Sequence, residues 1–332
     1  MFQTILLPLD GSRQAEGILP HAIALAAAFG AAVELLHVIP ASAGPHRAGP
    51  ADPIGSRMKR ADGAGYLSEK ASELRAAGVE VAATRVEEGG AAEVIVALLR
   101  DGGYDAVGLT PHGDGQWRYL SIGCTAVAVV LNAQTSILLA PDSPTHRGDA
   151  SEPTSPYPYR RIMAPVDCSP RSDWAVGIAA TLARKSGAHL QVVHILLPPE
   201  VVSRHPTGGS ARSLVERMVE TNRAEARRYL DETVQRHQTP DLSLEGVVIH
   251  GHSGPAEAVG VFSEEEDIDL VILSAHGRGV SSEWPLGGTA AKLMLRAQKP
   301  VLLLQDLPRQ RRLREAAPAS ARALASDLRT SR

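Results

Sequence analysis

The chain has 332 residues, of which 44% are hydrophobic and 21% are charged, and its formal net charge is −3. This length predicts about two domains, and this composition is typical of globular proteins. A net charge this close to zero argues against nucleic acid or an anionic membrane as a general electrostatic partner.

The two cysteines, Cys124 and Cys168, form no metal-spaced cluster, which favours a reducing compartment. Strand-like sequence begins at once, without a basic leader, and no apolar run approaches the roughly 20 residues of a membrane-spanning helix. We therefore expect a cytoplasmic protein.

The first half alternates short apolar runs with helical segments. A strand at 4–9 ends at Asp10, a helix runs to about Gly30, and a second strand covers 32–38. Residues 41–63 are rich in Gly, Pro and Ala and predict a mobile loop. The remaining expected elements are a helix at 66–76, a strand at 79–86, a helix at 91–100, a strand at 105–110, a helix from Gly123 and a strand at 136–140.

The second half repeats this order. Residues 142–158 are dense in turn formers and predict a linker. The expected elements that follow are a strand at 161–166 ending at Asp167, a helix, a strand at 190–195, a helix at 211–236, a strand at 243–250, a helix after Pro255, a strand at 269–274, a helix and a strand at 300–304. We expect domains at 1–141 and 159–306, and a partly disordered, Arg-rich tail at 307–332.

Strands of nearly continuous Val, Ile and Leu alternating with helices indicate parallel sheets that are covered on both faces. Right-handed crossovers then favour an α/β fold of two tandem, doubly wound, five-stranded sheets. In such sheets ligands bind at the carboxyl ends of the strands, where the strand order reverses. If strands one and four flank that point, Asp10 and Gly113 share one crevice, and Asp167 and Gly277 share another.

A His-Gly-x-Gly loop follows the fourth strand of both halves, at 112–115 and at 276–279. Another glycine stands ten residues after the first one, at Gly123 and at Gly287, and this equal spacing indicates duplication. A glycine loop before a helix start offers free amides to a phosphate. Neither loop is a Walker A motif, which needs Gly-Lys-Ser/Thr, and Ser282 stands where a dinucleotide fingerprint needs its third glycine.

Four segments, at 7–12, 36–38, 164–167 and 299–302, resemble the universal stress protein family in its arrangement with two domains in one chain. The resemblance covers roughly 1–141 and 159–306. It implies a Rossmann-like fold of the adenine-nucleotide alpha hydrolase type. ATP-binding members carry Gly-x2-Gly-x9-Gly-Ser/Thr after strand four and an Asp from strand one at the adenine, so ATP, with or without magnesium, is the implied cofactor.

The site residues implied by this resemblance are Asp10, Val38, Gly113, Gly123 and Thr125 in the first half, and Asp167, Ile195, Gly277, Gly287, Gly288 and Thr289 in the second. Both halves depart from the pattern at two positions. The first glycine is replaced by Thr110 and Ser274, and the hydroxyl residue after the third glycine by Cys124 and Gly288. A threonine stands one residue later in each half. The smaller Ser274 and Gly288 favour the second half for ATP.

Several of these residues have a second interpretation. Asp10 and Asp167 could instead cap the helix that follows each of them. Loop polarity or a hydrogen bond to phosphate explains His112 and His276 better than catalysis or metal binding does, since the sequence supplies no partners for such a role. His37 and its counterpart His194 end strands and are expected to be structural.

These patterns favour a stress-response regulator that binds an adenine nucleotide in at least one domain, more readily in the second. No catalytic or metal-ligating residues are assigned, because no nucleophile–base pair, carboxylate pair or metal set has a suitable spacing. A tandem scaffold that binds proteins but no nucleotide, and a slow ATP hydrolase, are the alternatives. We expect the halves to pack as an internal pseudo-dimer, with apolar closing strands such as 301–304 contributing; a homodimer, a protein partner and the role of the tail stay open.

Overall fold

The structure, a computed structural model, describes residues 2–40, 53–113, 122–141, 155–198, 208–251, 253–278 and 285–305. The strands are β1 (Thr4–Pro8), β2 (Ala32–Ile39), β3 (Val81–Glu88), β4 (Ala106–Leu109), β5 (Ser136–Leu139), β6 (Arg161–Val166), β7 (His189–Leu196), β8 (Ser243–His250), β9 (Leu270–Ser274) and β10 (Val301–Leu304). The helices are α1 (Arg13–Glu16), α2 (Leu19–Phe29), α3 (Pro53–Ala76), α4 (Ala91–Asp101), α5 (Cys124–Asn132), α6 (Pro170–Ser186), α7 (Gly208–His237), α8 (Pro255–Glu265) and α9 (Gly288–Leu295).

The strands form one sheet with the order β3-β2-β1-β4-β5-β10-β9-β6-β7-β8. Neighbours within each half run parallel, with β1 between β2 and β4, and β6 between β7 and β9. This arrangement confirms the predicted pair of five-stranded, doubly wound units. Strands one and four are adjacent in both halves, as the crevice hypothesis requires.

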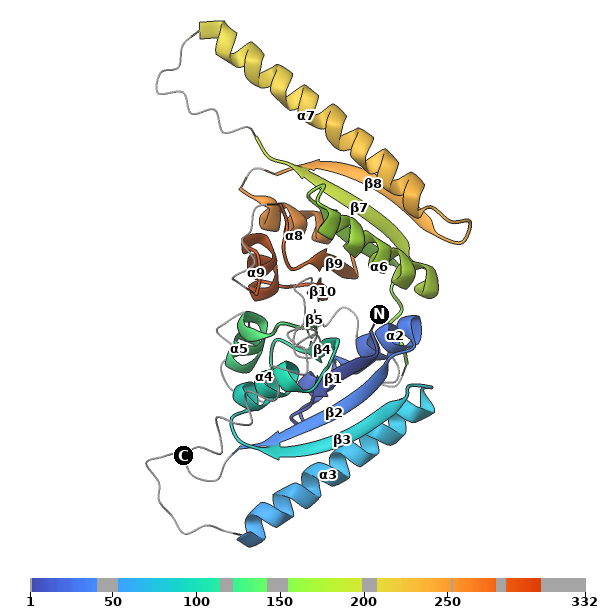
Figure 1. The fold of residues 1–332 in the computed structure, drawn as a ribbon, viewed down its shortest axis with the longest axis vertical. Coiled ribbons are helices and arrows are strands. Elements are labelled where there is room, and N and C mark those ends of the chain that lie inside the picture. The colour runs from blue at the N-terminus through green and yellow to red at the C-terminus, as the bar shows by residue number, and fades with distance from the viewer. Residues whose placement is uncertain are drawn as a thin grey trace, which may run out of the picture.

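The closing strands join the two units. β5 and β10 pair antiparallel, with Leu139 opposite Val301 and Ile137 opposite Leu303. The expected contribution of the apolar closing strands is therefore confirmed. Pairing protects two strands that would otherwise be exposed sheet edges, and the sheet runs without a break through the molecule (Figure 1).

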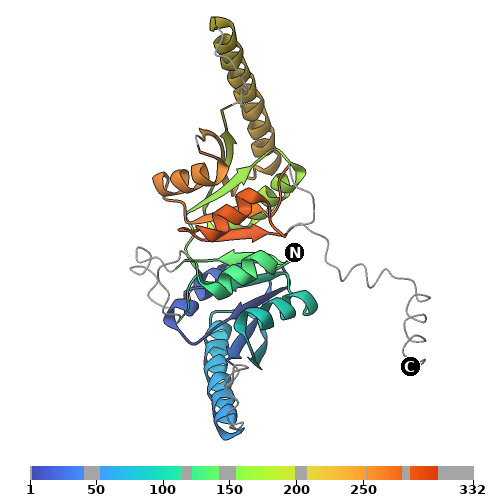
Figure 2. The same cartoon turned by 90° about the vertical axis from the view of Figure 1, so that its left-hand side faces the viewer.

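Helices cover both faces of this sheet. α2, α3, α6 and α7 lie on one face and α4, α5, α8 and α9 on the other, as the two views in Figures 1 and 2 show. Side chains of β1 alternate between the faces: Ile5 and Leu7 pack under the first helix layer, and Leu6 packs under the second. Each layer buries one apolar cluster that includes residues of both halves, so the halves share their cores.

The loop prediction for 41–63 is wrong for residues 53–63, which belong to α3. Glycines suggested a loop, but Gly63 has a packing role: a Cβ built there would stand 2.8 Å from Cδ2 of His37 on β2. The helix can therefore approach the sheet closely. Ser56 Oγ and Arg60 Nε also donate to Glu88 Oε1, each at 2.8 Å, which ties the start of α3 to β3. Residues 41–52 lie outside the described part of the chain.

The end of the predicted linker packs on the first half. Tyr157 stacks on the His21 ring of α2 with centroids 4.1 Å apart, and its amide donates to Pro20 O at 2.9 Å. The Tyr159 hydroxyl lies 2.7 Å from His21 Nδ1. These contacts fix the chain immediately before β6. Residues 142–154 of the linker and the tail from 306 onward fall outside the described ranges.

Candidate functional site

The carboxyl ends of strands one and four meet in both halves. Gly113, which follows β4, lies so close to Asp10 that an added Cβ would stand 2.0 Å from Asp10 Oδ2. The equivalent distance from Gly277 to Asp167 Oδ2 is 2.2 Å. Only a glycine permits this approach, so the middle glycine of each motif is explained by its contact with the strand-one carboxylate.

The Asp167 carboxylate bridges two loops. Its Oδ1 accepts from the Ser169 amide at 3.0 Å, and its Oδ2 accepts from the Arg278 amide at 2.7 Å. Burial opposes ionisation of this carboxyl group, but hydrogen bonds from Ser169 and Arg278 outweigh it and lower its pKa. Asp167 is therefore held as a carboxylate at neutral pH.

The helix caps are serines, and the aspartates stand two residues before them. Ser12 Oγ accepts from the Ala15 amide at 3.1 Å, and Ser169 Oγ accepts from the Ser172 amide at 3.2 Å. Asp10 Oδ1 accepts from the Ser12 amide at 2.9 Å, as Asp167 does from Ser169. The capping interpretation of the aspartates thus holds only indirectly: they fix the turn that presents the serine cap.

The hydroxyl residues that replace the first motif glycine have the same partner in both halves. Thr110 Oγ1 donates to His112 O at 2.8 Å, and Ser274 Oγ donates to His276 O at 2.9 Å. Each hydroxyl therefore holds the loop that follows its strand. The substitution adds a bond that a glycine could not make.

The third motif glycine is the N-cap of the next helix. Gly123 donates to Pro111 O at 2.7 Å, and Gly287 donates to Ala275 O at 2.8 Å, so the helix start is tied to the loop. Neither N-cap supplies a side-chain hydrogen bond to the first turn. The amides at the start of α5 and α9 thus point from an uncapped helix terminus, which carries partial positive charge.

All residues implied by the resemblance line two equivalent cavities. The cavity of the first half has a volume of about 320 Å³ and that of the second about 430 Å³. Asp10, Val38, Gly113, Gly123 and Thr125 line the first. Asp167, Ile195, Gly277, Gly287, Gly288 and Thr289 line the second. Apolar side chains, among them Leu36 and Ile95 in the first and Val259 and Leu293 in the second, complete the walls.

Arg278 is a cavity residue that the sequence interpretation missed. It lines the second cavity, and its Nη2 donates to Cys168 O at 3.1 Å. Alignment of the two repeats could have revealed it, because the residue after the middle glycine is Asp114 in the first half and Arg278 in the second.

Cys168 occupies the position of Gly11 with an unusual backbone. Its φ is 61°, in the left-handed region, and the φ of Gly11 is 86°. Its Sγ lies 3.6 Å from His194 Nδ1, and burial raises the pKa of the thiol. A further cavity of about 510 Å³ begins at Cys168 and extends beneath α7, sharing His194, Ile195 and Arg278 with the second crevice.

The histidines near the crevices fall into two groups, those on strand two and those in the loop after strand four. His37 Nδ1 lies 2.8 Å from Leu9 O and His194 Nδ1 lies 3.0 Å from Val166 O, which confirms their structural role in joining strands one and two. Burial lowers the pKa of His194. His112 lines the first crevice, whereas its counterpart His276 is buried with 1% of its surface exposed. Within the described ranges no three metal-ligating side chains gather, and no helix is long and apolar enough to cross a membrane.

Comparison with known proteins matches both halves to one family. A model of the universal stress protein family matches residues 1–141 and 158–305. The universal stress protein A homolog 1 of Coxiella burnetii is 29% identical over 119 residues, which cover 36% of this chain and 78% of that protein.

Solved structures share the fold across both halves. A universal stress protein from Archaeoglobus fulgidus has a TM-score of 0.57 at 17% identity, covering 91% of this chain and 98% of its own. A structure from Pseudomonas aeruginosa bearing the same family name has a TM-score of 0.59 at 16% identity, covering 91% and 93%. The likeness to these structures extends over the ten-stranded arrangement, and the family model accounts for each half separately. The chain therefore belongs to the universal stress protein family.

Proposed function

We propose that this chain is a stress-response regulator that binds an adenine nucleotide, ATP, in at least one of its two crevices and more readily in the second. One observation carries the proposal. In each half a carboxylate from strand one, the end of strand two, a glycine loop and an uncapped helix N-terminus line a single cavity. This set matches the residues that the family's ATP-binding pattern uses.

The chemistry of the cavity walls suits the parts of a nucleotide. Asp167 carries accepting oxygens that suit the amino group of an adenine, and Ile195 offers the base an apolar surface. The amides at the start of α9 suit phosphate oxygens, since a helix N-terminus favours anions. Both cavities lie within the roughly 300–1,000 Å³ typical of ligand pockets.

Three features favour the second half. Its cavity is larger, at about 430 Å³ against about 320 Å³. The first residue of its helix is Gly288 in place of Cys124, which lets a ligand approach the backbone. Arg278 adds a guanidinium, the group best suited to phosphate, where the first half has the acidic Asp114.

Isothermal titration with ATP, with and without magnesium, tests the proposal. We expect saturable heat and a rise in melting temperature at about 1 mM ATP, where a complex with a Kd of about 1 mM is already half formed. Arg278→Ala should weaken this binding, while Arg227→Ala on the exposed face of α7 should leave it unchanged. Absence of heat and of any melting shift under both conditions contradicts nucleotide binding and leaves the scaffold alternative. The hydrolase alternative is tested by the rate of ATP hydrolysis. A rate unchanged in Asp167→Ala and in Gly277→Val would come from a contaminant, and the alternative would then be rejected.

A further inference from the structure

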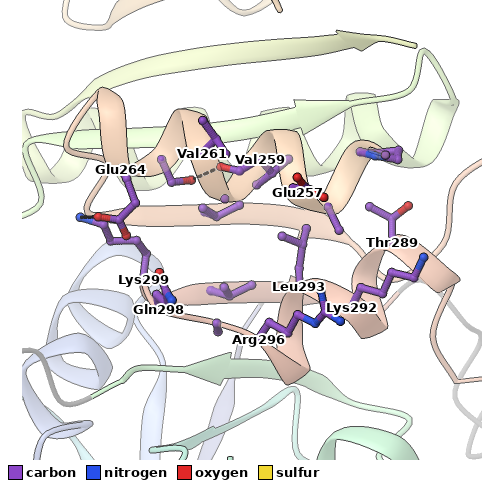
Figure 3. A pocket seen from close by; sticks show the side chains of 18 of the residues that line it. Glu257, Val259, Val261, Glu264, Thr289, Lys292, Leu293, Arg296, Gln298 and Lys299 are labelled. Atoms are coloured by element: carbon purple, nitrogen blue, oxygen red, sulfur yellow. Dashed lines mark hydrogen bonds and ion pairs between the residues drawn. The ribbon is translucent and has the colours of Figure 1, made fainter. Parts of the chain in front are cut away.

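A groove on the outer face of the second half lies between α8 and α9. It has a volume of about 410 Å³, and its floor is formed by Val271 of β9 and Val301 of β10. Figure 3 shows Val259 of α8 and Leu293 of α9 within it, while polar side chains from both helices stand around its edge. Val259 and Leu293 are almost fully buried, whereas Val261 of α8, which also lines the groove, is 52% exposed and offers an apolar surface to solvent.

Two basic side chains, Lys292 and Arg296, line one edge of this groove. Lys292 lies in the last turn of α9 and Arg296 is the C-cap residue of that helix; both are exposed, and neither forms an ion pair with a residue in the described part of the chain (Figure 3). Two positive charges four residues apart at the end of one helix repel each other, which costs some stability. Placement near the C-terminus of α9 offsets part of that cost through the helix dipole. An anion between them would remove the repulsion.

The acidic residues of the groove do not neutralise this edge. Glu264 of α8 pairs with Lys299 at 3.8 Å, and this pair lies at one end of the groove. Glu257 stands in the first turn of α8, where the helix dipole already favours a carboxylate. With the Glu264–Lys299 pair balanced, Lys292 and Arg296 outweigh Glu257, and the groove keeps a net positive charge.

The hollow depends on a glycine that packing does not require. Gly260 lies inside α8 and lines the groove, yet a Cβ built there would meet no atom within 4 Å. A glycine inside a helix stabilises it less than an alanine would. The helix therefore gives up stability at a lining position where a large side chain would take up room in the groove.

The first half lacks this combination of residues. Counted from the N-cap glycines, Gly260 corresponds to Val96, Lys292 to Ala128 and Arg296 to Asn132. The cations and the glycine are thus found together only in the second repeat, although both repeats share the same fold. An apolar hollow and a positive edge on adjacent helices suit one ligand that carries both an apolar body and a negative charge.

We propose that the α8–α9 groove is a binding site for a small organic anion with an aromatic or otherwise apolar body. The apolar body lies over Gly260 and Val261, and its carboxylate or sulfonate lies against Lys292 and Arg296. The chain's own tail does not suit the groove, because residues 306–332 carry seven Arg against three acidic residues and would meet the cationic edge with like charge.

This site shares a wall with the second crevice. Pro255, Val259, Thr289 and Leu293 line both cavities, so the two lie on opposite sides of the same side chains. A ligand that wedges α8 from α9 would press on residues that also shape the crevice. The site is nevertheless distinct from it, since Gly260, Lys292 and Arg296 line the groove and are absent from the crevice wall.

The full chain can be titrated with 1-anilinonaphthalene-8-sulfonate, whose fluorescence rises in apolar surroundings, and with N-phenyl-1-naphthylamine, the same aromatic body without the sulfonate. We expect the sulfonate to bind more tightly than the neutral probe. Lys292→Ala/Arg296→Ala should weaken sulfonate binding about tenfold, as expected for loss of charge-assisted hydrogen bonds. Gly260→Leu should abolish binding of both probes by filling the groove.

Two matched variants control for charge and for helix stability. Arg223→Ala/Arg227→Ala removes another exposed pair at the same spacing, on α7, and should leave the affinity unchanged. Gly260→Ala restores helix propensity but adds one methyl group, so it should change the affinity far less than Gly260→Leu. Thermal melts of each variant establish that it is folded.

The remaining outcomes overturn the proposal. Equal affinity for the two probes, or unchanged affinity of the Lys292→Ala/Arg296→Ala variant, would show that charge plays no part. Unchanged affinity of Gly260→Leu would place the probe elsewhere, including in the crevices. Absence of any fluorescence change with the unmodified chain would show that the groove binds no such anion.

Discussion

The crevices of the two halves are built from equivalent loops but differ in charge and in side-chain size. Both keep the close approach of a glycine to an aspartate and the hydroxyl bond that holds the histidine loop. The lining residues diverge at Cys124 and Gly288, and Arg278 lines the second crevice where the sequence of the first half has Asp114. Contacts within the loops therefore constrain the backbone of both copies, while other side chains that line the cavities differ between them.

Substitution of the middle glycines, Gly113 and Gly277, tests the close approach to an aspartate that both loops share. We expect Gly113→Ala and Gly277→Ala each to lower the free energy of unfolding by about 1–3 kcal/mol, because the new methyl group would overlap an aspartate oxygen. Urea denaturation of each variant measures the loss. Gly288→Ala meets no atom within 4 Å and should change stability by no more than about 0.5 kcal/mol.

Similar stability of Gly277→Ala and Gly288→Ala would contradict the carboxylate contact as the reason for the glycine. A large loss in one half alone would show that the two loops are not equivalent, despite their matching distances.

Exchange of the loop charges sharpens the contrast between the crevices. Arg278→Asp gives the second half the residue of the first and should weaken ATP binding about tenfold, through loss of a phosphate partner. The reverse change, Asp114→Arg, gives the first half the residue of the second and should strengthen ATP binding there. Titration calorimetry measures both. If Arg278→Asp leaves the affinity unchanged, Arg278 does not account for any preference for the second half.

Low pH should lower the stability of the protein through protonation of His194. Burial lowers the pKa of His194 from 6.5, so the folded state binds this proton less readily than the unfolded state does. Its contribution to stability is therefore full above about pH 6.5 and is lost as the pH falls through the folded-state pKa. Denaturation midpoints at about pH 7 and about pH 5, on either side of the ordinary histidine pKa, should converge in His194→Gln.

His250 provides the control, because it is exposed at the end of β8. His250→Gln should leave the acid-induced loss of the parent protein in place. A loss of equal size in His194→Gln would assign the pH dependence to other groups.

The smallest expected effect concerns the backbone of Cys168. A non-glycine residue with φ of 61° carries about 1 kcal/mol of strain, and Cys168→Gly relieves it while adding freedom to the unfolded chain. The net gain in unfolding free energy should be about 0.5 kcal/mol. The reverse change in the first half, Gly11→Ala, should cost about 1 kcal/mol. A loss in both variants would mean that the contact of Cys168 with His194 outweighs the strain.

Much of the fold could be predicted because the strands are continuous apolar runs and the motif spacing repeats. The strand at 243–250 and the helix after Pro255 lie where the pattern places them. The start of α3 could not be predicted in the same way. Its composition resembles a loop, and its helical state depends on contact of Gly63 with His37 and of Arg60 with Glu88, which are remote in sequence.

Some features of the candidate site could be predicted from the sequence, and others could not. The repeated spacing located the glycine loops, and the resemblance to the universal stress protein family supplied the other residues that line each cavity. The rotamers of Thr110 and Ser274 were not predictable, because their hydroxyls turn to the loop carbonyl of a residue whose position depends on the folded loop. Arg278 was missed because its role depends on which side chains face the cavity.

Hydrophobic periodicity and glycine spacing are properties of neighbouring residues, so they were enough to predict the local elements, their order and the duplication. How the halves join, through antiparallel pairing of β5 with β10, and the position of Arg278 at the second cavity follow only from the folded chain. It also decided that Gly260, Lys292 and Arg296 share one groove. Such contacts depend on the packing of separate elements against each other, which no local pattern records.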